Sequence, residues 1–577
     1  MALRACLILL CLIITGAACQ PLRHKPIQTS YVFVPTPDST HVRDMSEIAK
    51  ATSMLLSAKG FDNASEHVFV ATLEYISSMA QRIAKEGDNE PLFTVLSHPH
   101  PNIQISEAIS RFANFTKSQT RKEERIDLSL RILNVPYQLT LEMMTFVVER
   151  MGRVLFVIDF TSAAAIDFAE HHGYDFVIVN VLPTIIFNKN IPQYLSRYPF
   201  TSSSLRSNRQ VLNTLGTLHY LWHRFHEEVI LFARLAKDMF GIVSELNAKR
   251  KANGLPQKYN VFYESTHRVF IHFALPGFFD NSFPIDHNHF FVGYKQASKV
   301  NHLGKSTLFQ RGSTSVDNLS DEEMTTWLSK QQQVALIAFG TKVEIAPVHM
   351  TQILKSLIET NMSVVCIYSH PETLGLKALP PQVLFQTWVN QPLVLSHAST
   401  KVFVSHGGAN SVVESIEAEI PLIVFPIFGD QFGNAVRVED AGIGLSVSEE
   451  MDGEQISTIT HHVKYILEHQ FEMKSRMQVM KRANQRLSQL SIQSVMQLGC
   501  EKLSQFLERT GSNVLAASDL IIQVGQEGSD NFISDTSHKL TWIEKINMHH
   551  VAILLIITTI IAIYISFRKV ISHRKVL

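Results

Sequence analysis

One short segment, residues 402–411, constrains the fold of this chain more than any other. It joins an apolar run at 402–404 to the turn Ser-His-Gly-Gly at 405–408 and then to Asn410, where a helix is expected to begin. A strand that passes through glycines into a helix N-terminus presents backbone N–H groups and the positive end of the helix dipole to a ligand. Glycine also lets a phosphate approach the backbone closely. The segment therefore predicts an anion site, suited to a diphosphate, at the carboxyl edge of a parallel sheet.

Strands alternate with helices along much of the chain. Strands are expected at 31–35, 154–158, 176–179, 290–293, 334–339, 363–368, 402–404 and 421–426, and helices at 45–57, 73–85, 162–172 and 322–328. This alternation predicts an α/β protein with doubly wound parallel sheets. Because 577 residues exceed what one hydrophobic core usually holds, two such lobes are expected.

The charge composition argues against a nucleic-acid partner. Lys and Arg together number 52, as do Asp and Glu, and the body of the chain holds no basic run. The histidine doublets His171-His172 and His461-His462 lack cysteines or carboxylates at ligand spacing, so no metal is expected.

Both ends of the chain carry membrane-targeting patterns. Residues 1–18, with one Arg, a short apolar run and small residues, are typical of a secretory signal peptide. Residues 549–567 predict a transmembrane helix, and the basic tail 568–577 places the C-terminus in the cytosol. The expected location is the endoplasmic reticulum or another secretory-pathway membrane, with a lumenal body. Whether the last four residues are a retrieval signal or only juxtamembrane charges stays open.

Two further features agree with a lumenal body. Glycosylation sequons begin at Asn63, Asn114, Asn318 and Asn361. After removal of the signal peptide, only Cys19, Cys366 and Cys500 remain, which are too few and too scattered for a disulfide framework.

The region 388–434 resembles the donor-binding signature of the UDP-glycosyltransferases, above all the membrane-anchored UDP-glucuronosyltransferase type. The resemblance is carried by Trp388, Gln391, His406, Gly407, Gly408, Asn410, Ser411, Glu414, Pro421, Pro426, Asp430, Gln431 and Asn434. It implies the GT-B fold, in which two Rossmann-like lobes face each other across a cleft. It also implies a UDP-sugar as co-substrate, with no other cofactor.

The resemblance also suggests a division of the chain. After the signal peptide, the expected parts are an acceptor-binding lobe at 19–293, a linker at 294–321, a UDP-sugar-binding lobe at 322–500 and a membrane-proximal envelope at 501–548.

Donor binding is expected to use four kinds of contact. The flat face of Trp388 suits stacking on uracil, although a core tryptophan is the alternative, and Gln391 offers an amide edge. His406 is placed to donate to a β-phosphate oxygen as negative charge builds on the leaving UDP. The backbone of 407–410 and the hydroxyls of Ser411 and Thr341 add further donors. The resemblance implies that Glu414 accepts from the ribose hydroxyls, and that Asp430 and Gln431, at a strand end, bind the sugar hydroxyls.

The base is expected from the first lobe. The resemblance implies that a histidine in the loop after the strand 31–35 deprotonates the acceptor, and His41 occupies that place. A carboxylate should orient the ring, as in a catalytic triad. Asp159, at the end of the strand 154–158, is the first choice, and Asp38, Asp167 and Asp175 are the alternatives.

Two residues depart from the family pattern. Asn390 replaces a proline, which is expected to loosen the turn before Gln391. Glu419 replaces a glycine before Ile420-Pro421; it is either strained by about 1 kcal/mol at positive φ or marks a reshaped loop.

The predicted function is inverting transfer of a hexose or hexuronic acid from a UDP-sugar to a hydroxyl of a lipophilic small molecule. The alternatives are a sterol- or sphingolipid-directed transferase and a non-catalytic UDP-sugar binder. An oxidoreductase is disfavoured because the first βα turn lacks a GxGxxG run. No cation in the motif pairs with a glucuronate carboxylate, which slightly favours a neutral hexose. The sugar, the acceptor and the oligomeric state are left open, and an oligomer is among the states allowed.

Overall fold

The computed structural model describes residues 29–37, 39–61, 63–85, 90–98, 136–181, 243–258, 268–275, 288–295, 318–340, 345–375, 381–427, 430–447, 453–491 and 512–529. The predicted signal peptide, membrane span and basic tail lie outside these ranges, as do Asp38, Asn114, Cys19, Cys500 and Thr341. Among the helices within these ranges, none has the length and apolar character that crossing a membrane requires.

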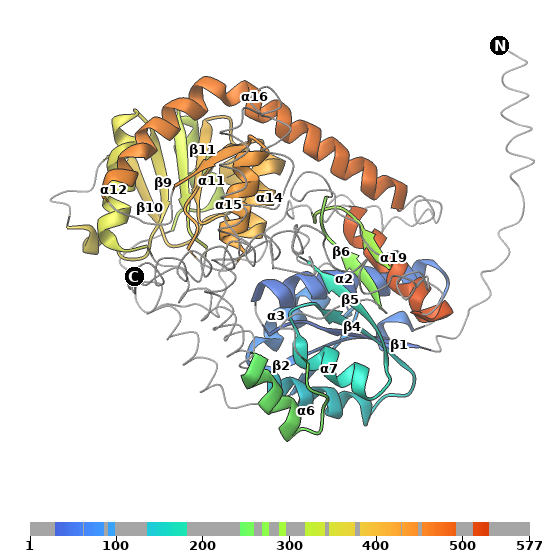
Figure 1. The fold of residues 1–577 in the computed structure, drawn as a ribbon. Coiled ribbons are helices and arrows are strands. Elements are labelled where there is room, and N and C mark those ends of the chain that lie inside the picture. The colour runs from blue at the N-terminus through green and yellow to red at the C-terminus, as the bar shows by residue number, and fades with distance from the viewer. Residues whose placement is uncertain are drawn as a thin grey trace, which may run out of the picture.

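The N-terminal lobe is built on a seven-stranded sheet (Figure 1). In spatial order its strands are β3 (Thr94–His98), β2 (Val68–Leu73), β1 (Ser30–Val34), β4 (Val154–Asp159), β5 (Asp175–Asn180), β6 (Val269–His272) and β7 (His289–Phe291). All six described pairings are parallel. Both faces of β4 are buried, which explains why its sequence is a continuous apolar run rather than an alternating one.

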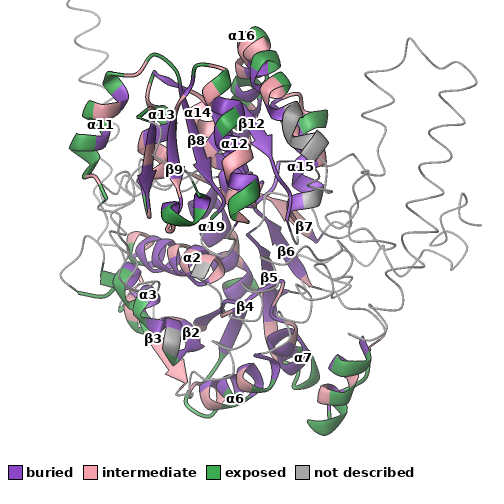
Figure 2. Cartoon of the chain, turned by 90° about the vertical axis from the view of Figure 1, so that its left-hand side faces the viewer, coloured by how far each residue is buried: buried purple, intermediate pink, exposed green. Residues whose placement is uncertain are grey.

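Helices cover both faces of this sheet. They are α2 (Ser39–Ala58), α3 (Glu74–Lys85), α6 (Tyr137–Val148) and α7 (Ala163–His171), with the short η1 (Ala64–Glu66) and a further helical stretch at 243–252. Successive strand residues point to opposite faces, so Tyr31 and Phe33 join one core with α2 and α3. Val32 and Val34 join the other core with α6 and α7. Figure 2 shows the strands buried between helices whose outer faces are exposed.

The helix α19 (Ser512–Glu527) packs in the N-terminal lobe although it comes last among the described helices. Its apolar side chains belong to the same core as α2, and Ser518 Oγ donates to the carbonyl oxygen of Ile48 at 3.2 Å. Lys59 Nζ also donates to Asp519 Oδ1 at 2.5 Å. The long helix α16 (Gly453–Ser491) runs from the C-terminal lobe toward α19 (Figure 1). The membrane-proximal role of 501–548 stays a prediction, and part of that segment is lobe core.

The C-terminal lobe repeats the design with a six-stranded sheet. Its strands, in spatial order, are β10 (Val383–Gln386), β9 (Ser363–Ile367), β8 (Val334–Ala338), β11 (Thr400–Ser405), β12 (Leu422–Val424) and β13 (Gly444–Ser446). Its helices are α11 (Asp321–Ser329), α12 (Pro347–Glu359), α13 (Gln391–Ser396), α14 (Ala409–Ala418) and α15 (Gln431–Asp440), with the short η5 (Pro371–Leu374). The five pairings are parallel. The prediction of two doubly wound parallel-sheet lobes is confirmed.

The two departures from the family pattern have structural explanations. Glu419 adopts φ 59° as the C-cap of α14, so the position does need a left-handed backbone. Its strain of about 1 kcal/mol is opposed by contacts of its carboxylate with Lys481 and Gln478, each at 2.9 Å. The expectation that Asn390 loosens its turn is wrong, because Asn390 is the N-cap of α13 and its Nδ2 donates to Asp321 Oδ2 at 2.9 Å.

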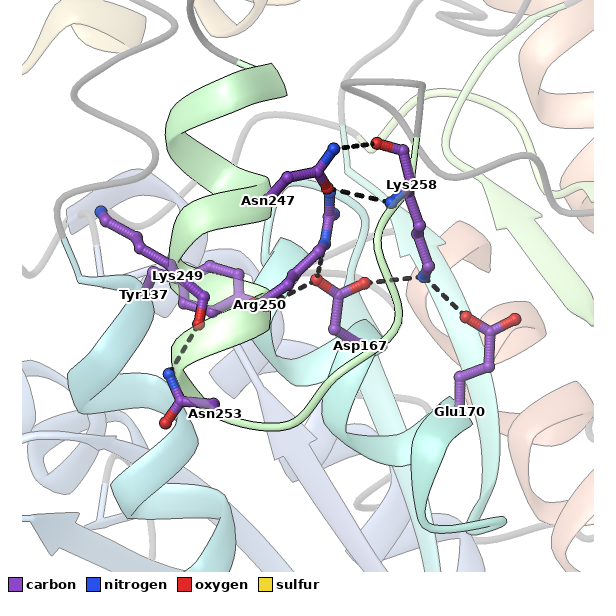
Figure 3. A network of polar contacts seen from close by, with 8 residues as sticks. All are labelled: Tyr137, Asp167, Glu170, Asn247, Lys249, Arg250, Asn253 and Lys258. Carbon is purple, nitrogen blue, oxygen red and sulfur yellow. Dashed lines mark hydrogen bonds and ion pairs between the residues drawn. The ribbon is translucent and has the colours of Figure 1, made fainter.

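A buried ionic network ties α7 to the helical stretch 243–252 (Figure 3). Asp167 Oδ2 accepts from Arg250 Nε and from the hydroxyl of Tyr137, both at 2.7 Å, and Asp167 Oδ1 accepts from Lys258 Nζ at 2.6 Å. Burial and the neighbouring Asp167 raise the pKa of Tyr137. These contacts commit Asp167 to structure and remove it as the candidate partner of His41.

Candidate active site

A short contact joins His41 to Asp159 in the N-terminal lobe. His41 lies in the first turn of α2, directly after β1, and Asp159 ends the neighbouring strand β4. His41 Nδ1 and Asp159 Oδ2 are 2.6 Å apart, and the Asp159 side chain is fully buried. Because a carboxylate can only accept, Nδ1 carries the proton and the lone pair of the neutral ring lies on Nε2. Asp159, which the sequence analysis favoured as the partner of His41, is therefore the carboxylate that lies beside it.

Threonines orient the Asp159 carboxylate. Its Oδ1 accepts from the Thr161 backbone N–H at 2.9 Å and from the Thr161 hydroxyl at 2.6 Å. Thr36 lies beside both, 3.5 Å from Oδ1 and 2.5 Å from the Thr161 hydroxyl oxygen. Oδ2 is therefore directed at His41. The sequence analysis missed both threonines, although an aspartate often accepts from the backbone N–H two residues further on, as Asp159 does from Thr161.

The N-terminus of α14 lies just after β11, at the carboxyl edge of the C-terminal sheet. The helix begins at Ala409, one residue before the expected Asn410, and Gly408 is its N-cap. None of the described side chains caps its first turn, so its leading N–H groups can serve the anion site that the sequence predicts. Ser411, two residues into the helix, is almost fully buried. The predicted strand–turn–helix is therefore present.

The glycines of the turn make room for neighbouring side chains. A Cβ on Gly408 would lie 2.6 Å from His406 Nε2, and one on Gly340 would lie 3.0 Å from His406 Cε1. Gly407 has φ +75°, and a Cβ there would lie 2.4 Å from Val424 Cγ1. The His406 ring is thus held between two glycine backbones. Gly340, two residues after β8, thus lies against the His406 ring, a contact that the sequence analysis did not predict.

Trp388 and Glu414 lie on elements adjacent to this turn. The Trp388 side chain is 36 % exposed, which rules out the core position considered as its alternative. Gln391, the first residue of α13, donates through Nε2 to Glu414 Oε2 on α14. Burial raises the pKa of Glu414, while Arg43 and Gln391 oppose that rise.

Asp430 and Gln431 begin α15 rather than ending a strand, so that expectation is corrected. Asp430 is the N-cap of α15, and its Oδ2 accepts from Asn434 Nδ2 at 2.8 Å. The same Asn434 group donates to the Gly407 carbonyl oxygen at 2.9 Å, which fixes α15 to the glycine turn. Gln431 is buried, and its Oε1 accepts from the Ile427 N–H at 2.8 Å.

The two lobes bring His41 and Asp430 within electrostatic reach of each other. Burial raises the pKa of Asp430 above its ordinary value, and His41 of the opposite lobe is among the groups that oppose the rise. Within the described ranges, no three His, Cys, Asp or Glu side chains gather as a metal site requires. The arrangement is an imidazole–carboxylate pair in one lobe and, in the other, an acidic side chain whose charge interacts with the imidazole.

Comparison with known proteins agrees with this geometry. The structure is similar to that of the glycotransferase of kitacinnamycin, with a TM-score of 0.51 and 15% sequence identity over 87% of this chain and 99% of that one. Two facing parallel-sheet lobes of this kind define the GT-B class of glycosyltransferases. Residues 313–482 match the family described as "UDP-glucoronosyl and UDP-glucosyl transferase". The match is confined to residues 313–482, so this part of the C-terminal lobe is what resembles the family.

Similarity to curated relatives is confined to part of each protein. The chain is 27% identical over 167 residues to nuatigenin 3-beta-glucosyltransferase of Solanum aculeatissimum, which covers 27% of this chain and 34% of that enzyme. It is 43% identical over 70 residues to UDP-glucuronosyltransferase 3A1 of Mus musculus, covering 12% of this chain and 13% of that enzyme. The chain therefore spans well under half the length of these relatives.

We expect Gly407→Ala to weaken UDP binding about tenfold or more, since the new methyl must displace Val424 or the turn itself. Gly375→Ala is the matched control. Gly375 also has a positive φ, +64°, but among the described residues its Cβ would meet no atom within 4 Å. Gly375→Ala should lower the free energy of unfolding by about 1 kcal/mol and leave the UDP affinity unchanged. Calorimetric titration with UDP measures the affinity of each variant. Equal affinities for Gly407→Ala and Gly375→Ala would contradict the role of the turn.

Proposed function

We propose that the chain is an inverting UDP-glycosyltransferase that moves a hexose or hexuronic acid onto a hydroxyl of a lipophilic small molecule. The observation that carries the proposal is the 2.6 Å contact between His41 Nδ1 and Asp159 Oδ2, in the lobe that faces the glycine turn. A non-catalytic binder would have no use for an imidazole held in this tautomer. The family of the 313–482 domain supports a UDP-sugar as donor.

In the proposed reaction, His41 Nε2 takes the proton of the acceptor hydroxyl. The acceptor oxygen then bonds to C1 of the sugar while the bond from C1 to the UDP oxygen breaks, and UDP leaves with that electron pair. Attack and departure on opposite faces invert the configuration at C1. Asp159 stabilises the imidazolium until its proton passes to solvent. The charge that develops on UDP is met by the N-terminus of α14 and by His406.

The remaining donor contacts are proposed on the same geometry. The exposed face of Trp388 takes the uracil, and Gln391 and Glu414 lie at the ribose. Asp430 and Gln431 are assigned to the sugar hydroxyls, with Gln431 acting through its amide group beside Ile427. Thr341 is proposed as a phosphate contact because of its position in the sequence, directly after Gly340.

A membrane location remains part of the proposal. The predicted leader, span and basic tail put the body in the lumen of the endoplasmic reticulum or a related compartment. An anchored enzyme would meet acceptors that partition into lipid. Membrane fractionation and protease protection of the full chain test this, and cleavage of the body in sealed vesicles would contradict it.

We expect His41→Ala to lower acceptor-dependent UDP release about 10²–10⁴-fold, with UDP binding retained, because the base is lost and the donor site is not. The assay uses microsomes that express the full chain, a panel of UDP-sugars and mixed phenol and sterol acceptors. His171→Ala, which removes an exposed histidine, is the control and should keep full activity.

Three other outcomes would overturn parts of the proposal. Full activity in His41→Ala would remove His41 as the base. UDP binding by the wild type without turnover of any donor would favour a non-catalytic binder. Absence of UDP binding would contradict the donor site itself.

A further inference from the structure

The chain passes from one lobe to the other at residues 292–295, directly after β7, which we call the crossing segment. The side chain of Val292 belongs to the core that α2 and α19 share in the N-terminal lobe, whereas the fully buried Tyr294 belongs to a core of the C-terminal lobe. The Tyr294 hydroxyl also donates to Glu417 Oε1 of α14 at 3.0 Å. Tyr294 is therefore anchored in the C-terminal lobe, and Gly293 alone separates it from the N-terminal core.

Two buried asparagines fix the path of the crossing segment. Asn484 Nδ2 of α16 donates to the Tyr294 carbonyl oxygen at 3.0 Å, and Asn513 Nδ2 of α19 donates to the Val292 carbonyl oxygen at 2.5 Å. Gly293 lies between these two carbonyl groups with φ +84°, and a Cβ there would lie 2.5 Å from Asn513 Nδ2. The crossing segment is thus held from both sides at a point where a side chain has no room.

Lys295, the last residue of the crossing segment, reaches back to the N-terminal lobe. Its Nζ donates to Asp44 Oδ1 at 2.5 Å and lies 2.6 Å from Glu47 Oε2, and both carboxylates belong to α2. The side chains of Lys295 and Glu47 are each 14% exposed and that of Asp44 is 3% exposed, so these ion pairs are screened little by solvent. Although burial opposes it, Lys295 and Arg43 hold the pKa of Asp44 below its ordinary value, and the aspartate stays ionised.

The part of α2 that Lys295 contacts is the part that carries the candidate base. His41 lies in the first turn of α2, Asp44 follows three residues later, and Glu47 three residues after that. Residues three apart are neighbours on a helix surface, so Lys295 contacts the turn that directly follows His41. Because Tyr294, the residue before Lys295, is anchored in the lobe that contains the glycine turn, the ion pairs link the position of His41 to that of the donor site.

We propose that Lys295 is a positioning residue for His41, because it ties the first turns of α2 to the C-terminal lobe and so sets the place of the base relative to the donor. This inference rests on the proposed function and deepens it. The base on one lobe must bring the acceptor oxygen into line with C1 of a sugar that the other lobe binds. An error of about 1 Å in such a placement can lower a rate about 10²-fold.

The alternative is that Lys295 only stabilises the fold. A loss of folded protein would lower the rate by the same factor whether or not the base is present. A residue that acts through His41 would instead have no further effect once His41 has been removed. A double-mutant cycle between Lys295 and His41 therefore separates the two explanations.

The test measures kcat for acceptor-dependent UDP release by the full chain in microsomes, and UDP affinity by calorimetry on the purified full chain. We expect Lys295→Met to lower kcat about 10–100-fold with UDP affinity unchanged, and to leave the residual rate of His41→Ala unaltered. Lys295→Arg, which keeps the charge, should retain most of the wild-type kcat. If Lys295→Met fails to fold, its combination with Asp44→Asn, which also removes the carboxylate left behind, carries the test.

Lys59→Met is the matched control, because Lys59 directly follows α2 at the end far from His41 and pairs with Asp519 at 2.5 Å. It removes an ion pair of the N-terminal lobe and should leave kcat unchanged. An unaltered kcat in Lys295→Met, or an equal fractional loss in the wild-type and His41→Ala backgrounds, would overturn the inference while the proposed function stands. Full activity in His41→Ala would overturn the proposed function and the inference with it.

Discussion

Asp159→Asn is expected to lower kcat about 10³–10⁴-fold while UDP affinity stays unchanged. The asparagine oxygen would take the place of Oδ1, which accepts from the backbone and hydroxyl of Thr161. Its NH₂ group would then face His41 Nδ1 in place of Oδ2. That reversal makes Nδ1 the acceptor and puts the ring proton on Nε2, where the lone pair is needed. The fold should survive, because the two side chains have nearly the same shape.

The control for this prediction is Asp175→Asn. Asp175 begins the next strand, β5, and was an alternative partner of His41, but its Oδ2 accepts from the Ser529 backbone N–H at 3.4 Å. Its replacement should change kcat less than about twofold, as surface changes away from a site usually do. Acceptor-dependent UDP release and UDP titration give the two quantities. If Asp159→Asn turned over at the wild-type rate, an oriented tautomer would have no part in the reaction.

Asp167→Asn is expected to destabilise the N-terminal lobe by about 3–5 kcal/mol. The change removes the charge that Arg250 and Lys258 share and leaves the Arg250 guanidinium, whose side chain is 3% exposed, without its counter-ion (Figure 3). The side-chain volume is unchanged, so the cost is electrostatic rather than a packing defect. Thermal unfolding of the purified full chain should show a loss of about 10 °C.

Glu170→Gln separates burial from pairing in this network. Glu170 contacts the same Lys258 Nζ at 2.6 Å as Asp167 does, but its side chain is 41% exposed. An exposed ion pair contributes about 0–1 kcal/mol, so Glu170→Gln should shift the midpoint of thermal unfolding by a few degrees at most. Equal shifts for the two variants would show that burial of Arg250 does not set the cost.

Most of the apolar strands were predictable, including the three-residue strands β7 and β12, but other short strands were not. β1, β4, β5, β8 and β11 were found because buried parallel strands are continuous apolar runs bounded by turn residues. β10 and β13, with four and three residues, are short enough for periodicity to miss them. β2 was missed for another reason: it ends at Leu73 and α3 begins at Glu74, so no turn residue separates them.

The residues of the candidate site also fall into a group that could be predicted and a group that could not. The glycine turn could be predicted because the φ of Gly407 and the start of α14 are decided within a few residues. The supporting residues could not. Thr36 lies 123 positions from Asp159, and Lys295, which donates to Asp44, lies 251 positions from it. Such pairs meet only because of the strand order and the meeting of the lobes.

The sequence by itself determined two parallel-sheet lobes, a glycine turn at 405–408 that leads into a helix, and a histidine in the segment that follows the first strand, because each depends on neighbouring residues. Only the tertiary structure decided which carboxylate serves His41. β1 and β4 are adjacent in the sheet, so their carboxyl ends bring His41 and Asp159 together across 118 positions, while Asp167 is taken by Arg250. The tertiary structure also placed α19 in the first lobe. Those contacts follow from strand order and lobe packing, which residue spacing along the chain does not encode.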